Sequence, residues 1–431
     1  MLVDYIIILI LFLFAYFMIA FKNFLNIDIP IWSIFLIASV LLVVLNVIKP
    51  EEAYQLVNYD VIIFLFSMFT IGSALRLCGA IDYFIKRILS RCSKFEDVLL
   101  FVVIGIGIIS GFLMNDTLAL IATPMMLEIS KKLDINPKVL LLALAFSVTT
   151  GSVFTPLGNP QNLLIALESG VRAPFITFLY YLSIPTLINL FILYYYLKII
   201  FKKEINAPRE KFKQKLELVV KTSLNFNLNR KESKITIIIA SATFIAIILT
   251  DLIQLFGIYY LNISWISLIG ATAILTVLPL RRRIIEDIDW GILIMFSAMF
   301  VLMGTVYNEG LLNVFLNLIR PNNVEIIQLA SVAFATVSMS QIISNVPMTF
   351  LFLPIFLHQF LSSQTKIWVT LAWSSTIAGN LTILGAASNL IILEIAEKNN
   401  VKISYFEFFK YGSIITILNS IVLFLAVLIL P

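Results

Sequence analysis

Long apolar runs follow one another along this chain, many of them close to the roughly 20 residues that a helix needs to cross a bilayer. Hydrophobic residues make up 60% of the 431 residues and charged residues 13%. A soluble globular protein is about half apolar and about a quarter charged. We therefore predict an all-α polytopic membrane protein, integral to the cell membrane of a prokaryote.

Two short polar stretches interrupt these apolar runs. Residues 155–162 read Thr-Pro-Leu-Gly-Asn-Pro-Gln-Asn, and residues 382–389 read Thr-Ile-Leu-Gly-Ala-Ala-Ser-Asn, so that both follow the pattern Thr-x-x-Gly-x-x-x-Asn. A helix that breaks inside a bilayer is tolerated only where the break is buried in protein or lines a polar cavity. Corresponding breaks in the two halves of a chain therefore indicate a binding site.

The interruptions belong to a longer internal repeat. Asn115 lies nine residues before Pro124, and the pair Asn345 and Pro354 repeats this spacing 230 residues later. Each Asn joins two apolar arms that are short for a full crossing, which predicts a re-entrant hairpin. The first repeat spans 1–201 and the second 234–431, with a linker at 202–233 between them. We predict hairpins at 97–130 and 325–361, and broken helices at 138–168 and 367–397.

The linker sets the predicted orientation. Residues 202–234 hold ten Lys and Arg and no long apolar run, so the positive-inside rule places them in the cytoplasm. Counting outward from the linker gives ten spans, two re-entrant hairpins and both termini outside. The first hairpin then enters from the cytoplasm and the second from the outside, which makes the halves inverted-topology repeats.

The two hairpin tips and the two helix breaks should meet near the middle of the membrane. Free backbone N–H groups and the positive ends of half-helices suit an anion or a small neutral oxo-species, and freed carbonyls suit Na⁺. Asp116 is the one acidic residue in these loops, and we predict that it couples transport to H⁺ or Na⁺. The predicted substrate and ion-binding residues are Asn115, Asp116, Thr117, Thr155, Gly158, Asn159, Gln161, Asn162, Ser344, Asn345, Thr382, Gly385, Ser388 and Asn389.

Other interpretations fit parts of the pattern. A single Asn in a membrane helix often only bonds a neighbouring helix, and Asp116 also fits a helix cap at the hairpin turn. A Na⁺/H⁺ antiporter is an alternative in which Asp116 binds both ions in turn. An intramembrane enzyme needs paired Asp residues or a His-rich site, and a passive channel does not need inverted repeats. We therefore predict a transporter without a cofactor and not an enzyme. We also predict no binding of nucleic acid, because the basic residues lie in loops where membrane topology explains them.

The loop motifs resemble those of a known superfamily. Asn-Asp-Thr at 115–117, Thr-Pro-x-Gly-Asn-Pro-Gln-Asn at 155–162, Ser-Asn-Val-Pro at 344–347 and Thr-x-x-Gly-x-x-x-Asn at 382–389 are similar to motifs of the ion transporter superfamily. Within it they look most like the arsenite permease and NhaD-type branch, which is citrate-transporter-like. The divalent-carboxylate branch instead carries Ser-Asn-Thr at both tips.

This resemblance implies a scaffold domain, a mobile transport domain with elevator-type movement, and a homodimer in the lipid bilayer. It also implies secondary active transport of a small anion or oxo-species, either arsenite-like efflux or organic anion uptake, coupled to H⁺ or Na⁺.

Overall fold

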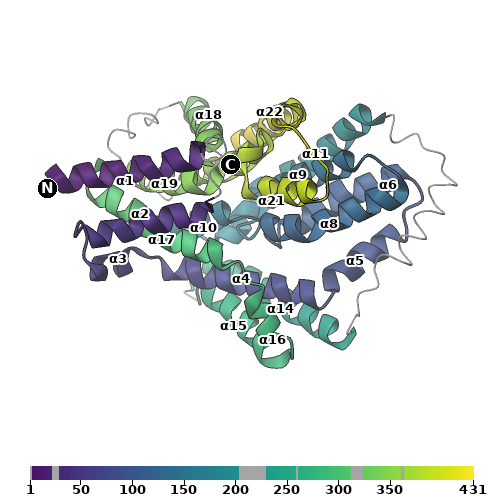
Figure 1. Cartoon of the computed structure of the whole chain (residues 1–431), viewed down its shortest axis with the longest axis horizontal. Helices are drawn as coiled ribbons and strands as arrows, with labels where there is room; N and C mark the ends of the chain where they lie inside the picture. Colours follow the sequence, from purple (N-terminus) through teal and green to yellow (C-terminus); the bar gives the residue numbers. More distant parts are fainter. Residues whose placement is uncertain (1, 22–28, 203–229, 259–260, 312–323, 361–363) are drawn as a thin grey trace.

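The computed structural model describes residues 2–21, 29–202, 230–258, 261–311, 324–360 and 364–431. Every regular element in these residues is a helix (Figure 1), which confirms the predicted all-α class. Nearly all of the linker predicted at 202–233 lies outside the described residues, and α14 already begins at Arg230.

The first half of the chain holds the elements α1 to α11. The hairpin predicted at 97–130 is seen as helical arms at 95–110 and 115–133, so its turn lies at 111–114. The bounds are α1 (Leu2–Phe21), α2 (Ile31–Val44), α3 (Pro50–Leu56), α4 (Tyr59–Leu77), α5 (Ala80–Leu89), α6 (Phe95–Leu100), the π-helical η1 (Phe101–Ile106), α7 (Gly107–Ser110), α8 (Asn115–Leu133), α9 (Pro137–Gly151), the 3-10 turn η2 (Ser152–Phe154), α10 (Pro160–Glu168) and α11 (Pro174–Ile200).

The second half repeats this order from α14 onward. Its hairpin turns at Ser344, and its broken helix is interrupted between 381 and 386. The bounds are α14 (Arg230–Leu255), α15 (Ile263–Val277), α16 (Arg281–Glu286), α17 (Trp290–Asn308), α18 (Glu325–Ile343), α19 (Asn345–Gln359), α20 (Thr365–Ile377), the 3-10 turns η4 (Ala378–Asn380) and η5 (Ile383–Gly385), α21 (Ala387–Lys398) and α22 (Tyr405–Ile429).

Helix starts at corresponding places in the two halves are fixed by the same device. The side chain of Asn58 accepts a hydrogen bond from the backbone N–H of Val61 and caps α4, and Asp289 accepts from Ile292 and caps α17. Such caps satisfy donors that the first turn of a helix leaves free.

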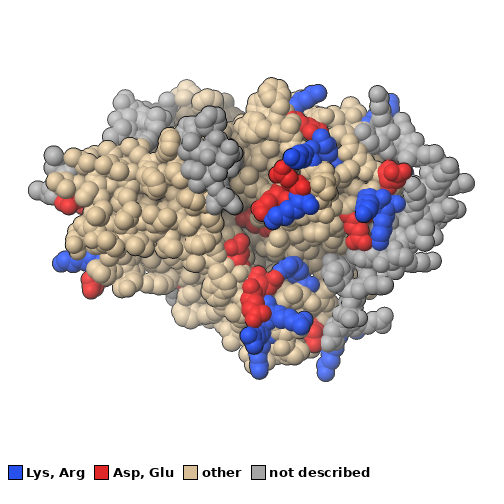
Figure 2. Space-filling view, in the orientation of Figure 1, with Lys and Arg blue, Asp and Glu red and all other residues tan. Residues whose placement is uncertain are grey.

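Seven described helices are long and apolar enough to cross a membrane, and three shorter apolar helices accompany them. The seven are Tyr59–Leu77, Pro137–Phe154, Pro174–Ile200, Lys231–Leu255, Trp290–Asn308, Glu325–Ile343 and Tyr405–Ile429. Figure 2 shows that most charged side chains lie over the part that holds α5, α6, α8, α16 and α21, while the surface over α1, α2 and α17 is almost free of charge. A broad uncharged belt of this kind is what a helical membrane protein presents to lipid.

The helices pack in two groups. In the first, α2 packs against α17 and α4 against α15, while α1 and α14 lie beside α2 and α15. In the second, α8 packs against α21, α10 against α19, and α11 against α22 (Figure 1). Each pair joins one element of the first half to one of the second, so neither half forms its core alone.

Candidate functional site

Both hairpin tips and both helix breaks meet around one small cavity, as the sequence predicts. Its volume is about 50 Å³. The first group of helices contributes Ile31 and Met295 to its wall, and the loops contribute the rest. The loop residues that line it are Asn115, Asp116, Pro160, Gln161, Ser344, Asn345, Val346, Pro347, Ala386 and Ala387.

Asn115 ties the first hairpin tip to both helix breaks. Its backbone N–H donates to the carbonyl of Gly158 at 2.9 Å, and its Nδ2 donates to Oγ of Ser388 at 3.4 Å. Its Oδ1 accepts from the backbone N–H of Asp116 at 2.9 Å. Asp116 is 7% exposed, and the backbone N–H of Ser388 lies close to its carboxylate. The carboxylate therefore lies at the positive end of α21.

The second tip places an asparagine side chain at the cavity. Ser344 turns the chain with φ 66°, and Asn345 begins α19. The Oδ1 of Asn345 is buried and makes no hydrogen bond among the described residues. Beside it, the hydroxyl of Tyr16 on α1 donates to the carbonyl of Pro347 at 3.1 Å. Asn345 thus lines the cavity and keeps a buried acceptor without a partner in the described chain.

Two Asn residues at equivalent positions satisfy the carbonyls that the breaks set free. The Nδ2 of Asn162 lies 3.1 Å from the carbonyl of Val153 and 3.3 Å from that of Thr155. The Nδ2 of Asn389 donates to the carbonyl of Gly379 at 2.6 Å. These predicted site residues hold the broken backbone together, and their side chains do not line the cavity.

The Thr residues of the two breaks fasten each break to the hairpin of its own half. The Thr155 hydroxyl donates to the carbonyl of Gly111, and the Thr382 hydroxyl donates to Oε1 of Gln341 at 2.8 Å. Thr117 lies against Gly72 of α4. The predicted residues that do not line the cavity are Thr117, Thr155, Gly158, Asn159, Asn162, Thr382, Gly385, Ser388 and Asn389.

Thr376 was not among the predicted site residues, although it joins the two broken helices. Its Oγ1 accepts from Nδ2 of Asn159 at 3.1 Å and donates to Oδ1 of Asn162 at 3.1 Å. Gln161, which lines the cavity, approaches the same hydroxyl at 3.5 Å. Thr149 lies 227 residues earlier, the same offset as between the two break motifs. Thr376 could therefore have been recognised in the sequence as part of the internal repeat.

The cavity wall is mostly apolar and carries a few polar groups, one of them acidic. It combines one carboxyl group with three side-chain amides and one hydroxyl. Among the residues that the structure describes, no Lys, Arg or His lines it. The described chain also holds no cluster of three His, Cys, Asp or Glu that suits a metal ion. The arrangement can therefore donate and accept hydrogen bonds and exchange one proton or bind one cation, but it offers no side-chain cation for a strongly charged anion.

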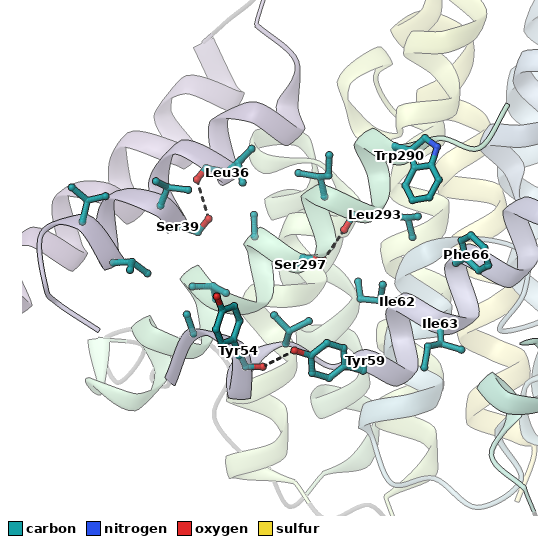
Figure 3. Close-up of a pocket in the computed structure, with 18 residues that line it drawn as sticks. Leu36, Ser39, Tyr54, Tyr59, Ile62, Ile63, Phe66, Trp290, Leu293 and Ser297 are labelled. Atoms are coloured by element: carbon teal, nitrogen blue, oxygen red, sulfur yellow. Dashed lines mark hydrogen bonds between the residues drawn. The ribbon is translucent and has the colours of Figure 1, made fainter. Parts of the chain in front are cut away.

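Larger cavities lie elsewhere. A groove of about 860 Å³ runs between α2, α3, α4 and α17 (Figure 3), lined by apolar residues such as Phe66, Trp290 and Leu293. Its two serines, Ser39 and Ser297, donate to carbonyls of their own helices. The groove thus offers little to a polar ligand.

Comparison with known proteins shows which family the chain belongs to. The model of the family described as citrate transporter matches residues 7–378. A silicon efflux transporter of Oryza sativa subsp. japonica is 27% identical over 84% of this chain and 84% of its own length. An uncharacterized transporter of Methanocaldococcus jannaschii is 29% identical over 92% of this chain and 97% of its own length, and a transporter of Dictyostelium discoideum named arsB is 23% identical over 89% and 84%. The sequence resemblance is confirmed: this chain is a membrane transporter that belongs to the citrate transporter family.

Proposed function

We propose that this protein is a secondary active transporter of a small oxo-acid that carries little or no charge, coupled to H⁺ or Na⁺. The observation that carries the proposal is the composition of the cavity, where both hairpin tips and both breaks present amides and one carboxylate, and the described lining has no basic side chain. A di- or tricarboxylate carries two or three negative charges, and Arg and Lys are the side chains that pair most strongly with them.

The size of the cavity favours the same class of substrate. A volume of about 50 Å³ exceeds the roughly 10–15 Å³ that one water molecule needs, so the cavity has room for a small polar molecule. Arsenous and silicic acid consist of one central atom with three or four hydroxyl groups, and their O–H groups can donate to the Asp116 carboxylate and to other polar side chains that line the cavity. The names of the rice and Dictyostelium relatives, which refer to silicon efflux and arsB, support this choice.

Asp116 is our candidate for the coupling residue. It is the acidic side chain of the described cavity wall, and burial makes its charge costly unless a proton or cation accompanies it. A Na⁺/H⁺ antiporter, in which the carboxylate binds both ions in turn, uses the same residue. The two functions are distinguished because the antiporter moves its ions without an oxo-acid substrate.

We further propose the predicted architecture of ten spans, two re-entrant hairpins and inverted repeats at 1–201 and 234–431. The packing of α2 on α17 and of α4 on α15 supports it. In the second half α15 is the equivalent of α2, and α17 is the equivalent of α4. The two pairs are therefore the same contact with the halves exchanged. The first group of helices is then the scaffold, and the hairpins, broken helices, α11 and α22 form the transport domain of an elevator-type homodimer.

The substrate class is tested by ligand-dependent thermal unfolding of the purified protein. Arsenous or silicic acid at 100 times its dissociation constant should stabilise the fold by about 2.7 kcal/mol, because only the folded state binds it. Citrate and sulfate should leave the unfolding temperature unchanged. The Asn345→Ala variant should lose most of the shift. Stabilisation by citrate together with indifference to both oxo-acids would contradict the proposal.

The topology is tested by cysteine labelling in a background without the native thiols, Cys78→Ala and Cys92→Ala. Ser90→Cys and Glu309→Cys place exposed thiols after α5 and after α17. An impermeant maleimide added to intact cells should label position 309 and not position 90, and inverted vesicles should give the opposite result. The background protein without added cysteine is the control. Labelling of both positions from one side means that the halves are not inverted.

A further inference from the structure

The start of α11 is capped by a residue of the other group of helices. Ala173, which precedes the helix, has a left-handed φ of 45° and makes no side-chain cap. Instead, Oδ2 of Asp251 on α14 accepts from the backbone N–H groups of Phe175 at 2.6 Å and Ile176 at 3.2 Å. These are the second and third residues of α11, and their N–H groups are the ones that an N-cap side chain normally satisfies. The carboxylate also lies at the positive end of the helix, where a negative charge is stabilised.

A second contact joins the two groups of helices close to the first. The Nδ2 of Asn58, at the start of α4, donates to Oε1 of Glu168 at the end of α10. A cavity of about 270 Å³, which we call the boundary cavity, lies between the groups at this place. Asn58 and Asp251 line it from the first group, and Ala166 and Pro174 line it from the second. The two contacts therefore lie at one place on the boundary between the groups.

The equivalent helix of the second half is capped by its own chain segment. This helix, α22, begins at Tyr405, and the Oγ of the preceding Ser404 accepts from the backbone N–H of Glu407 at 3.1 Å. Such a cap moves with its helix. The internal repeat thus places the cap of α11 on the boundary between the groups and the corresponding cap of α22 within one group.

Burial makes the contacts at the boundary costly to break. Asp251 is 1% exposed and Phe175 is 0% exposed. A buried N–H group or carboxylate that loses its partner costs free energy until water or another group replaces that partner. The second contact also reaches the candidate site, because α10 carries Gln161 on the wall of the cavity at the hairpin tips and Glu168 at its other end. Both contacts therefore oppose a separation of the two groups.

We propose that Asp251 and Asn58 form a latch, which holds the transport domain to the scaffold in this conformation and opens as a unit during transport. In the proposed topology α4 and α11 begin, and α10 and α14 end, at the outer face, so the latch joins the outer ends of the two domains. The inference rests on the proposed elevator-type movement, because a relative movement of the groups is what breaks the contacts. Neither residue lines the cavity at the hairpin tips, so both act by positioning the transport domain.

Hydrogen–deuterium exchange of the purified protein without substrate tests the latch, because one contact can be changed while the other is observed. Asn58→Ser keeps the cap of α4, since Ser caps a helix as well as Asn does, but its side chain is too short to reach Glu168. Glu168→Ala removes the acceptor. In each variant the N–H groups of Phe175 and Ile176 should exchange about tenfold faster, the order that the loss of one hydrogen bond to a charged group produces. Unchanged exchange at these two groups would overturn the latch, even where the unfolding temperature falls, because the two contacts would then be independent of each other.

Two comparisons make the result specific. Glu168→Gln keeps a side-chain oxygen that accepts from Asn58 Nδ2, so it should retain near-wild-type exchange at the start of α11. The N–H of Glu407, at the start of α22, should exchange at the wild-type rate in all three variants, because its cap lies within one group. Faster exchange at both helix starts would indicate a general loosening of the fold and would also overturn the inference. Because no substrate is present, the outcome does not depend on the oxo-acid test.

A cross-link separates failure of the latch from failure of the elevator mechanism. Leu167→Cys and Gln254→Cys, in the background Cys78→Ala/Cys92→Ala, place thiols in the two groups around the boundary cavity. Joining them with a cleavable bifunctional thiol reagent should stop uptake of arsenous acid into proteoliposomes, and reduction should restore it. The pair Gln254→Cys and Leu261→Cys, both in the first group, is the control that should keep transport when cross-linked. Transport by the cross-linked 167–254 protein would contradict the elevator movement, whereas blocked transport together with unchanged exchange rates would overturn the latch alone.

Discussion

Asp116→Asn is expected to reduce ion-driven accumulation of substrate in proteoliposomes to the level of protein-free vesicles. The change replaces a carboxylate by an amide of nearly the same shape, so that the residue no longer releases a proton or carries the charge that holds a cation. Among the described residues, no second carboxyl group lines the cavity to take over this role. We therefore expect a loss of coupling rather than a loss of structure.

The measurement separates these two effects. Uphill accumulation is followed under an imposed H⁺ or Na⁺ gradient, and the folded state is checked by gel filtration and thermal unfolding. Asp134→Asn is the matched control, because Asp134 is an exposed residue at the end of the same helix, and Asn tolerates its left-handed φ of 58°. Unchanged uphill transport by Asp116→Asn would exclude this residue from coupling, and equal losses in both variants would show that the effect is not specific to the cavity.

Gly158→Ala is expected to lower the free energy of unfolding by about 3–5 kcal/mol, because the added methyl group collides with backbone and disrupts buried hydrogen bonds. A Cβ at this position would lie 2.2 Å from the carbonyl oxygen of Ser152 and 2.7 Å from its Cα. Both are backbone atoms, so the break must open to make room. That carbonyl accepts from Nδ2 of Asn159 at 3.2 Å and of Asn162 at 3.4 Å.

Two other glycines give a graded series for this prediction. A Cβ on Gly385, the equivalent position in the second break, would lie 2.8 Å from the carbonyl oxygen of Ala378, and Gly385→Ala should be less harmful. A Cβ on Gly72 would meet Thr117 at an ordinary 3.4 Å, so Gly72→Ala is the matched control with a near-wild-type unfolding temperature. If Gly158→Ala is as stable as Gly72→Ala, the break at 155–159 is looser than the structure describes.

The positions of the broken helices could be predicted closely from the sequence. The segment predicted at 138–168 is seen as α9 and α10, from Pro137 to Glu168, with its interruption at 155–159. Hydropathy and a polar interruption are local properties, so both can be recognised in the amino-acid sequence alone. The first hairpin turn was less accurately predicted: it lies at 111–114, and Asn115 and Asp116 already belong to the first turn of α8.

The roles of the polar residues in the breaks could not be assigned in this way. Asn159, Asn162 and Asn389 cannot be told from a substrate-binding Asn by sequence, yet their side chains hydrogen-bond the breaks. Asn345 instead lines the cavity, and its Oδ1 has no partner in the described chain. An amide serves backbone and ligand equally well, and only the position of neighbouring carbonyls decides between the two.

The sequence by itself determined that the chain is helical, that it lies in a membrane, and that four polar loops interrupt its apolar runs at matching places. Only the tertiary structure decided which loop residues line the cavity, that Thr376 joins the two breaks, and that Asp251 of α14 caps α11. The physical reason is one of range. The burial of apolar runs is set by neighbours along the chain. Many hydrogen-bond partners instead lie far apart, from 41 residues for Thr382 with Gln341 to 331 for Tyr16 with Pro347, and they meet only when the helices pack.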